Sequence, residues 1–133
     1  MTLTKLYEIA EHDNIKVFSY NLGEFESLSL RDNKKCYIAV DPFLLVNIAD
    51  EKVKVAHELG HCETGAFYNE YSRLDVRQKH EHRADKWAIK KLVPKDELIE
   101  AFKTCTNRWE LSEHFDVTED FMQKALDYYS LQE

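Results

Sequence analysis

The stretch DEKVKVAHELGHCETG, residues 50–65, marks the point where this sequence changes from strand-like to helical patterning. We expect a helix here, because Asp50 is a residue type that accepts free backbone amides at a helix start and Gly65 is one that ends helices. Residues four apart lie on one face of a helix, about one turn from each other, so His57 and His61 project side by side. The pair therefore presents two imidazoles to whatever packs against that face.

Three short strand-like segments precede this helix, at residues 14–21, 25–30 and 35–40. Asn21 and Gly23 supply a turn between the first two, and RDNKK, residues 31–35, supplies one between the second and the third. Because short turns join consecutive strands, we expect a three-stranded antiparallel sheet. Apolar residues at three- and four-residue steps predict another helix at residues 2–13.

Four further helical segments follow the quoted stretch, at residues 76–93, 95–105, 107–115 and 119–132. Pro94 ends the first of them, and either Asp116 or Thr118 caps the last. We therefore expect a single α+β domain over residues 1–133, rich in helix, with the small antiparallel sheet packed beside the helix that carries the two histidines.

The composition indicates a folded protein with an acidic surface. Asp and Glu number 25 against 18 Lys and Arg, which gives a net charge of −7, and the lysines are interleaved with acids. Binding nucleic acid needs clustered Lys and Arg, so we expect no nucleic-acid partner. No apolar run approaches the roughly 18 residues of a membrane helix, and the N-terminus does not resemble a secretion signal. We therefore expect no membrane partner.

The cysteines favour a reducing compartment. Cys36, Cys62 and Cys105 are odd in number and lack the C-x-x-C spacing, whereas disulfide frameworks use even sets. We therefore expect a cytoplasmic protein without a disulfide framework. Cys62 follows His61 directly but points away from its face, so we expect it to be a small buried apolar residue.

The His-Glu-x-x-His pattern itself predicts a metal site. Neutral imidazoles at positions 57 and 61 can bind one zinc ion, and Glu58, one step round the helix, can reach a water molecule as a general base. Gly60 costs about 1 kcal/mol relative to Ala inside a helix, which is reasonable where another segment must approach closely. The alternative is two ordinary histidines that face solvent on an amphipathic helix.

The next helix offers the third ligand that a catalytic zinc ion needs. Within KHEHRADKWA, residues 79–88, Glu81 and Asp85 share one face, and the small Ala84 between them allows tight helix packing. We assign Glu81 as the ligand, and we expect Asp85 to accept a hydrogen bond from His57 or His61. His80 and His82 flank Glu81 and are the alternative ligands, but each points roughly 100° away.

Two stretches together resemble a known family. VAHELGH (residues 55–61) followed by EHRADKWAIKKLVP (residues 81–94) is similar to the ImmA/IrrE zinc metallopeptidases. That family pairs a HELGH helix with an E-x-x-A-[DN]-x-[FW]-A helix that ends in a hydrophobic-Pro step. Arg83 departs from the pattern, since many members carry an acidic residue there. The resemblance implies a zincin-like fold with His57, His61 and Glu81 as zinc ligands and Glu58 as the catalytic glutamate.

The same resemblance implies a function. Residues 1–94 would form the catalytic core with both ligand helices, and residues 95–133 a C-terminal helical tail. Small members of the family resemble the anti-repressor proteases of phages and integrative elements, which cleave a helix-turn-helix repressor. We therefore expect a zinc endopeptidase that acts on such a repressor. The alternative is a non-catalytic zinc-containing protein that binds and sequesters the repressor.

The sequence alone leaves open the substrate-binding edge, the oxyanion donor and the role of the C-terminal helices. An extended substrate could add to the edge of the sheet at CYIAV, residues 36–40. Tyr68 or Tyr71 could donate a hydrogen bond to the oxyanion, although ordinary loop aromatics are the competing explanation. Residues 110–126 have a helix-turn-helix pattern, but their acidity favours docking to protein over DNA.

Overall fold

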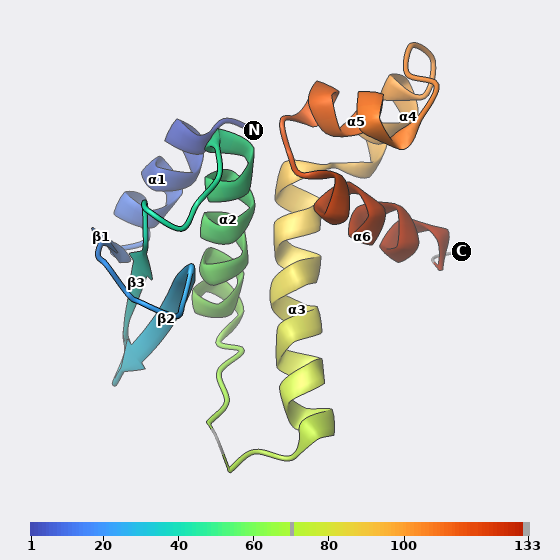
Figure 1. The fold of residues 1–133 in the computed structure, drawn as a ribbon. Coiled ribbons are helices and arrows are strands. Elements are labelled where there is room, and N and C mark those ends of the chain that lie inside the picture. The colour runs from blue at the N-terminus through green and yellow to red at the C-terminus, as the bar shows by residue number, and fades with distance from the viewer. Residues whose placement is uncertain (70, 132–133) are drawn as a thin grey trace.

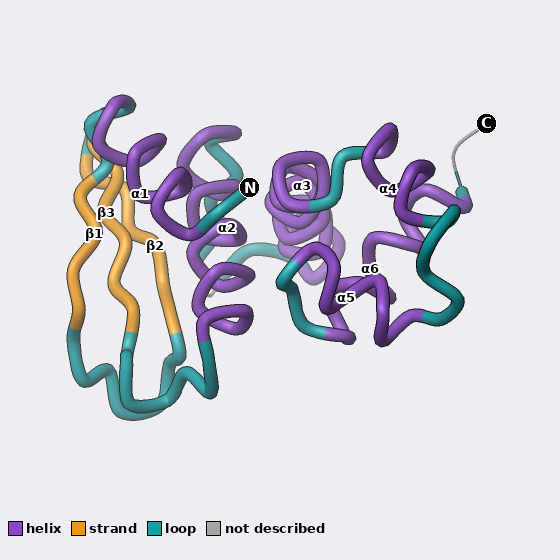
Figure 2. Tube along the Cα trace, turned by 90° about the horizontal axis from the view of Figure 1, so that it is seen from above, coloured by secondary structure: helices purple, strands orange, loops and turns teal. Residues whose placement is uncertain are grey.

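Helix α2, Ile48–Thr64, lies in the middle of the computed structural model, which describes residues 1–69 and 71–131. Helix α1 (Leu3–His12) and the sheet cover one side of α2, and helix α3 (Leu74–Leu92) packs along the other (Figure 1). Three shorter helices, α4 (Lys95–Ala101), α5 (Arg108–Phe115) and α6 (Glu119–Ser130), lie beyond α3 (Figure 2). The prediction of one α+β domain rich in helix is confirmed.

The sheet contains three strands, but its topology differs from the prediction. Strands β1 (Lys16–Ser19), β2 (Ser27–Asp32) and β3 (Lys35–Val40) lie in the order β1-β3-β2, with β1 parallel to β3 and β2 antiparallel to it. The sheet is therefore mixed, and the predicted antiparallel meander is wrong. A two-residue turn with Asn33 at φ 58° pairs β2 with β3, whereas the longer connection at residues 20–26 leaves room for β3 between β1 and β2.

This order changes which strand is exposed at the edge near α2. CYIAV lies in the central strand β3, so it has neighbours on both sides and cannot accept a further strand. The prediction of an edge at residues 36–40 is therefore wrong. Strand β2 has β3 on one side only, and no other described strand pairs with its second side. Strand β1 forms the other edge of the sheet, so the edge near α2 is β2.

The ends of α2 are set by short polar contacts. Asn47, not Asp50, is the N-cap: its side chain accepts a hydrogen bond from the Asp50 amide at 2.9 Å, and the Asp50 carboxylate accepts one from the Val46 amide at 3.1 Å. The helix thus begins earlier than predicted, because an asparagine side chain satisfies the free amides equally well. Gly65 ends it as predicted, with a left-handed φ of 67°.

The C-terminal helices begin close to the predicted positions, but α4 ends at Ala101, four residues before the predicted end at residue 105. Thr118 caps α6 by accepting a hydrogen bond from the Phe121 amide at 3.2 Å, which decides between the two predicted caps. Asp116 instead ends α5 in the left-handed region. The predicted end of the last helix at residue 132 lies outside the described residues. None of the described helices has the length and apolar character needed to cross a membrane.

The core lies between the sheet, α1 and α2 and continues between α2 and α3. Its largest fully buried apolar side chains come from every layer of the fold: Leu6, Ile38, Val55, Leu59, Ile89, Leu92, Val93 and Met122. Because α2 contributes to both halves of this core, its position is fixed relative to the sheet and to α3.

A disulfide joins the sheet to α2. Cys36 in β3 is bonded to Cys62 in the last turn of α2, with their Cα atoms 5.8 Å apart, and Cys105 is free. The expectation of no disulfide is therefore wrong, as is the expectation that Cys62 is merely a small buried apolar residue. Sequence spacing gave no sign of this bond, since the two cysteines meet only when β3 packs on α2.

Candidate metal centre

Three side chains from two helices converge at one point. His57 and His61 come from α2 and Glu81 comes from α3, and one potential ligand atom of each lies within 4.8 Å of the others. The two Nε2 atoms are 3.2 Å apart, and they lie 2.8 Å (His57) and 3.2 Å (His61) from the nearer carboxylate oxygens of Glu81. The structure thus brings together the three residues predicted as ligands, while His80 and His82 lie outside the cluster.

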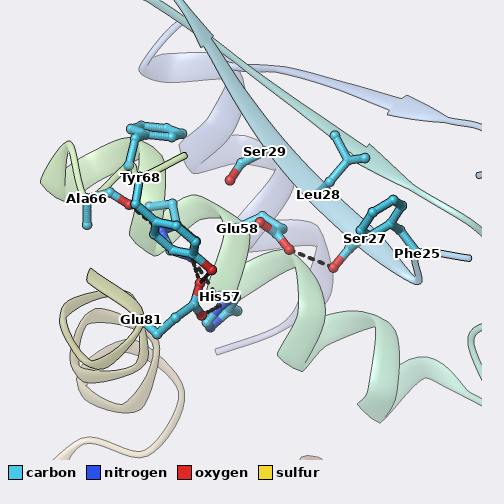
Figure 3. Close-up of a pocket in the computed structure, with 11 residues that line it drawn as sticks. Phe25, Ser27, Leu28, Ser29, His57, Glu58, Ala66, Tyr68 and Glu81 are labelled. Atoms are coloured by element: carbon cyan, nitrogen blue, oxygen red, sulfur yellow. Dashed lines mark hydrogen bonds and ion pairs between the residues drawn. The ribbon is translucent and has the colours of Figure 1, made fainter. Parts of the chain in front are cut away.

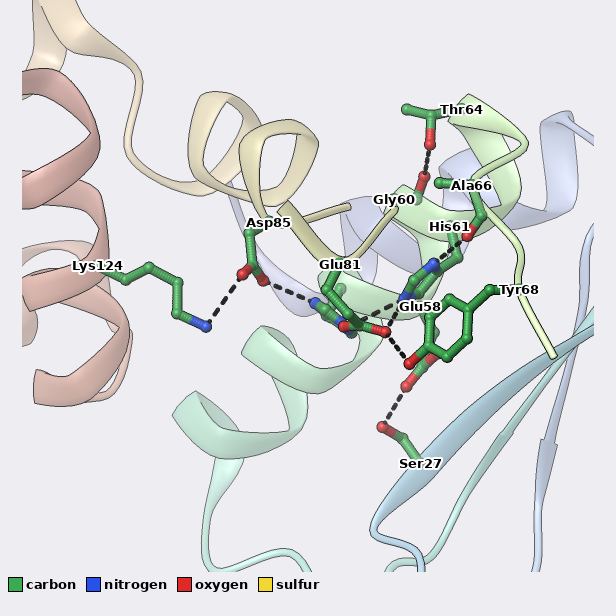
Figure 4. A network of polar contacts seen from close by, with 11 residues as sticks. Ser27, Glu58, Gly60, His61, Thr64, Ala66, Tyr68, Glu81, Asp85 and Lys124 are labelled. Atoms are coloured by element: carbon green, nitrogen blue, oxygen red, sulfur yellow. Dashed lines mark hydrogen bonds and ion pairs between the residues drawn. The ribbon is translucent and has the colours of Figure 1, made fainter. Parts of the chain in front are cut away.

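The far side of each imidazole is held by an acceptor. His57 Nδ1 donates to Asp85 Oδ1 at 2.8 Å. His61 Nδ1 donates to the carbonyl oxygen of Ala66 (Figure 4). A carboxylate and a carbonyl only accept hydrogen bonds, so both Nδ1 atoms carry hydrogen. In a neutral imidazole this leaves Nε2 with a free lone pair. The prediction that Asp85 orients one of the two histidines is confirmed, and the histidine is His57.

The donor set fits a zinc ion. Two Nε2 lone pairs and a carboxylate face each other, and three acceptors at such distances need either protons or a shared cation between them. Zinc binds nitrogen and carboxylate oxygen at about 2.0–2.2 Å, which places tetrahedral ligand atoms about 3.3–3.6 Å apart. The observed separations of 2.8–3.2 Å are close to that spacing. Two neutral histidines and one carboxylate are three ligands, so the fourth position of a tetrahedral zinc ion would be available to a water molecule.

In the protein without metal, the same contacts shift the pKa values of the three candidate ligands. Burial alone would lower the pKa of His57, but hydrogen bonds to Asp85 and Glu81 outweigh it and raise that pKa to about 9. The pKa of His61 is also raised, because hydrogen bonds to Glu81 and Ala66 outweigh the effect of burial. Hydrogen bonds from both histidines hold the pKa of Glu81 well below its usual range. The site therefore attracts positive charge.

Close helix packing makes this convergence possible. A Cβ atom added to Gly60 would lie 2.5 Å from the carbonyl oxygen of Ala84 in α3. The prediction that another segment approaches the backbone at Gly60 is thus confirmed. Because Glu81 lies one turn before Ala84, the same approach brings its carboxylate to the histidines of α2.

Glu58 lies beside the cluster and is held from the sheet. Its side chain is mostly buried, with 7% exposed, and its Oε2 accepts a hydrogen bond from Ser27 Oγ at 2.8 Å. Ser27 is the first residue of β2. Both residues line a cavity of about 240 Å³ together with His57, His61 and Glu81 (Figure 3). A carboxylate thus faces the cavity next to the candidate ligands.

The loop between the ligand helices contributes a phenol. Tyr68 Oη donates to Glu81 Oε1 at 2.7 Å, and this hydrogen bond raises the pKa of Tyr68 to about 12, so the hydroxyl keeps its proton. Tyr71 is 87% exposed, so Tyr68 is the tyrosine of the predicted pair that faces the cavity.

Sequence reasoning missed three supporting residues. Ser27 holds Glu58, the Ala66 carbonyl holds His61, and Lys124 in α6 forms an ion pair with Asp85 at 3.3 Å. The lysine stands more than thirty residues from the nearest predicted ligand, and a backbone carbonyl carries no side-chain signal. Only the packing of the sheet and of α6 against the two ligand helices reveals them.

The site lies where two hollows of the surface meet. A second hollow of about 570 Å³ continues from the first and shares with it the ligands His57 and Glu81, as well as Glu58. The edge strand β2, through Ser27 and the residues that follow, forms one wall together with Phe25 just before the strand, and α3 and α6 form the other.

Comparison with known proteins agrees with this geometry. The family model of the IrrE N-terminal-like domain, Peptidase_M78, matches residues 10–127, which is nearly the whole chain. No curated protein matches the chain. The matched range includes α2 and α3 and therefore all of the residues that converge at the site.

Proposed function

The chain belongs to the IrrE N-terminal-like family of peptidases, Peptidase_M78, and from this premise we propose that it is a zinc-dependent endopeptidase. One observation carries the proposal. The ligand atoms of His57, His61 and Glu81 converge on one point, and the Glu58 carboxylate lines the same cavity. A closed structural zinc site would more often use thiolates, and it would have no use for a second glutamate, Glu58, held in place by Ser27.

Each residue of the site has a part in this proposal. When bound, zinc supplies a Lewis acid that polarises the substrate carbonyl and lowers the pKa of a water molecule toward about 7. His57, His61 and Glu81 would hold the ion. Glu58 takes a proton from the attacking water and returns it to the nitrogen of the leaving amine, so that the peptide and water become a carboxylic acid and an amine, which at neutral pH are present as a carboxylate and an ammonium group.

Two further groups would assist. The Ser27 hydroxyl, 2.8 Å from Glu58 Oε2, keeps that carboxylate aimed into the cavity. The Tyr68 hydroxyl, now bonded to Glu81, would donate to the oxyanion that develops on the substrate carbonyl. Because its pKa is raised to about 12, Tyr68 remains a donor throughout the neutral pH range.

The substrate we propose is a protein segment in an extended conformation. Strand β2 offers the backbone groups of its free edge along the cavity, and an extended segment could pair with them as an added strand. The resemblance of VAHELGH and EHRADKWAIKKLVP to anti-repressor proteases suggests a helix-turn-helix repressor of a phage or mobile element as the target.

The test is the Glu58→Gln variant. The amide has the size of the carboxylate but does not accept a proton, so we expect zinc binding to be unchanged and cleavage of the repressor to fall by about 10²–10⁴-fold. Cleavage is followed by mass spectrometry of the products. Equal cleavage by variant and parent would refute the role of Glu58. A parent protein that binds the repressor and leaves it intact would favour sequestration instead.

A further inference from the structure

A disulfide lies directly behind the candidate metal centre. Cys62 follows the ligand His61 in the last turn of α2, and it is bonded to Cys36 in the central strand β3. The Cα separation of 5.8 Å is in the ordinary range for a disulfide, so neither the strand nor the helix must move to form the bond. The peptidase chemistry proposed above uses neither cysteine.

The bond is accessible to small molecules. Both cysteines are only half-buried, and they line a surface hollow of about 330 Å³ together with Asp13, Lys34 and neighbouring residues. Among the described residues, none that lines this hollow also lines the two hollows of the metal site. A small thiol can therefore approach the sulfur atoms without entering the catalytic groove.

A short series of contacts connects the disulfide to the metal ligands. Cys36 pairs with Arg31 across the β2–β3 ladder, and the Arg31 guanidinium lies 4.9 Å from the centre of the Phe67 ring. Phe67 stands between Ala66, which holds His61, and Tyr68, which donates to Glu81. The disulfide thus fastens the β2–β3 hairpin to α2 at the place where the hairpin covers the loop that supports both ligands.

We propose that Cys36 and Cys62 form a reversible redox pair, and that the disulfide form binds zinc more tightly than the dithiol form. In the reducing direction, one thiolate of a dithiol reductant attacks a sulfur of the disulfide and releases the other cysteine as a thiolate. The second thiol of the reductant then displaces the first cysteine, so that the reductant leaves as a disulfide and the protein gains two electrons and two protons. A low-molecular-weight disulfide drives the reverse reaction.

The physical reason for the difference in zinc affinity is how firmly the loop that contains Ala66 and Tyr68 is held in one conformation. Without the bond, packing and the Ser27–Glu58 hydrogen bond still join the hairpin to α2, but the end of α2 is held less firmly, and Ala66 and Tyr68 lose part of their fixed position. Changes in such supporting groups reduce metal affinity by about 10–100-fold, so we expect the dithiol form to bind zinc about 10-fold more weakly. We also expect its melting temperature to fall by roughly 10 °C, because a 26-residue separation is closed by the bond.

The experiment uses the intact protein in two redox states. One sample is treated with dithiothreitol and one with oxidised glutathione, and both reagents are then removed under argon. Alkylation of the native protein followed by mass spectrometry should count three reactive thiols in the first sample and at most one, Cys105, in the second, where any glutathione bonded to Cys105 is recognised by its mass. Competition with a chromophoric chelator then measures zinc affinity in each.

Two variants separate this effect from direct zinc binding by free thiols. The double variant Cys36→Ser with Cys62→Ser should bind zinc as weakly as the dithiol form and should not respond to oxidant, whereas Cys105→Ser should behave like the parent. If the double variant does not fold, the zinc affinities of the reduced and the oxidised parent protein still test the proposal. The proposal would be overturned if oxidants left all three thiols reactive, or if reductants left only one thiol reactive. Zinc affinities of the reduced and oxidised samples within twofold of each other would also overturn it.

Discussion

Replacing Gly60 by alanine tests how closely the two ligand helices must approach. The added Cβ atom would lie 2.5 Å from the Ala84 carbonyl oxygen and 3.0 Å from the Ala84 carbonyl carbon and Cα, whereas ordinary contacts begin at 3.4 Å. These are backbone atoms, so no side chain can turn aside. We expect α3 to move away from α2 by up to about 0.9 Å, the shortfall of the closest contact.

The expected effect on stability is small because two terms oppose each other. Overpacking costs about 1–3 kcal/mol, while alanine is favoured over glycine inside a helix by about 1 kcal/mol, so the net loss should be about 0–2 kcal/mol. The effect on the metal should be larger. Glu81 moves with Ala84, and zinc bond lengths tolerate only about ±0.2 Å, so we expect zinc affinity to fall by at least about 10-fold.

Zinc affinity is measured by competition with a chromophoric chelator and stability by urea unfolding of the metal-free protein. The matched control is Leu98→Ala in α4, which is 3% exposed and whose loss should cost about 2–5 kcal/mol without changing the α2–α3 contact. This control should bind zinc like the parent under conditions where it is folded. A Gly60→Ala protein with parental zinc affinity would refute the argument from helix approach.

Three other perturbations follow from the same contacts. Asp85→Ala removes the acceptor of His57 Nδ1, so zinc affinity should fall by about 10–100-fold, and a variant with unchanged affinity would show that the contact is dispensable. Tyr68→Phe removes the hydrogen bond to the ligand Glu81, so zinc affinity should fall by about 10-fold. In zinc-saturated protein kcat should fall by about 10²–10³-fold with little change in KM, and a changed KM alone would contradict the role of Tyr68 toward the oxyanion. In the metal-free protein the pKa of His57 is raised to about 9, so the stability gained from its proton is complete below about pH 6.5 and is lost as pH rises through 9. Urea midpoints of the chelator-treated protein should fall over that range, and a flat profile would contradict the hydrogen bonds to Asp85 and Glu81.

The sequence by itself determined the relations that lie within single helices. The four-residue spacing placed His57 beside His61 and Glu81 beside Asp85, because a helix repeats every 3.6 residues whatever surrounds it. The unfavourable Gly60 inside a helix correctly indicated a close neighbour. The strands and helices also lie close to their predicted positions, since their patterning is local.

Only the tertiary structure decided the relations between elements. In it β3 lies between β1 and β2, and β2 is the edge strand beside the metal site. Tyr68, and not the exposed Tyr71, contacts Glu81 at that site. The tertiary structure also brought Cys36 to Cys62. Each of these depends on which surfaces bury one another, and burial is decided by the whole set of packed elements together, whereas the hydrogen bonds of a helix are fixed by residues four positions apart.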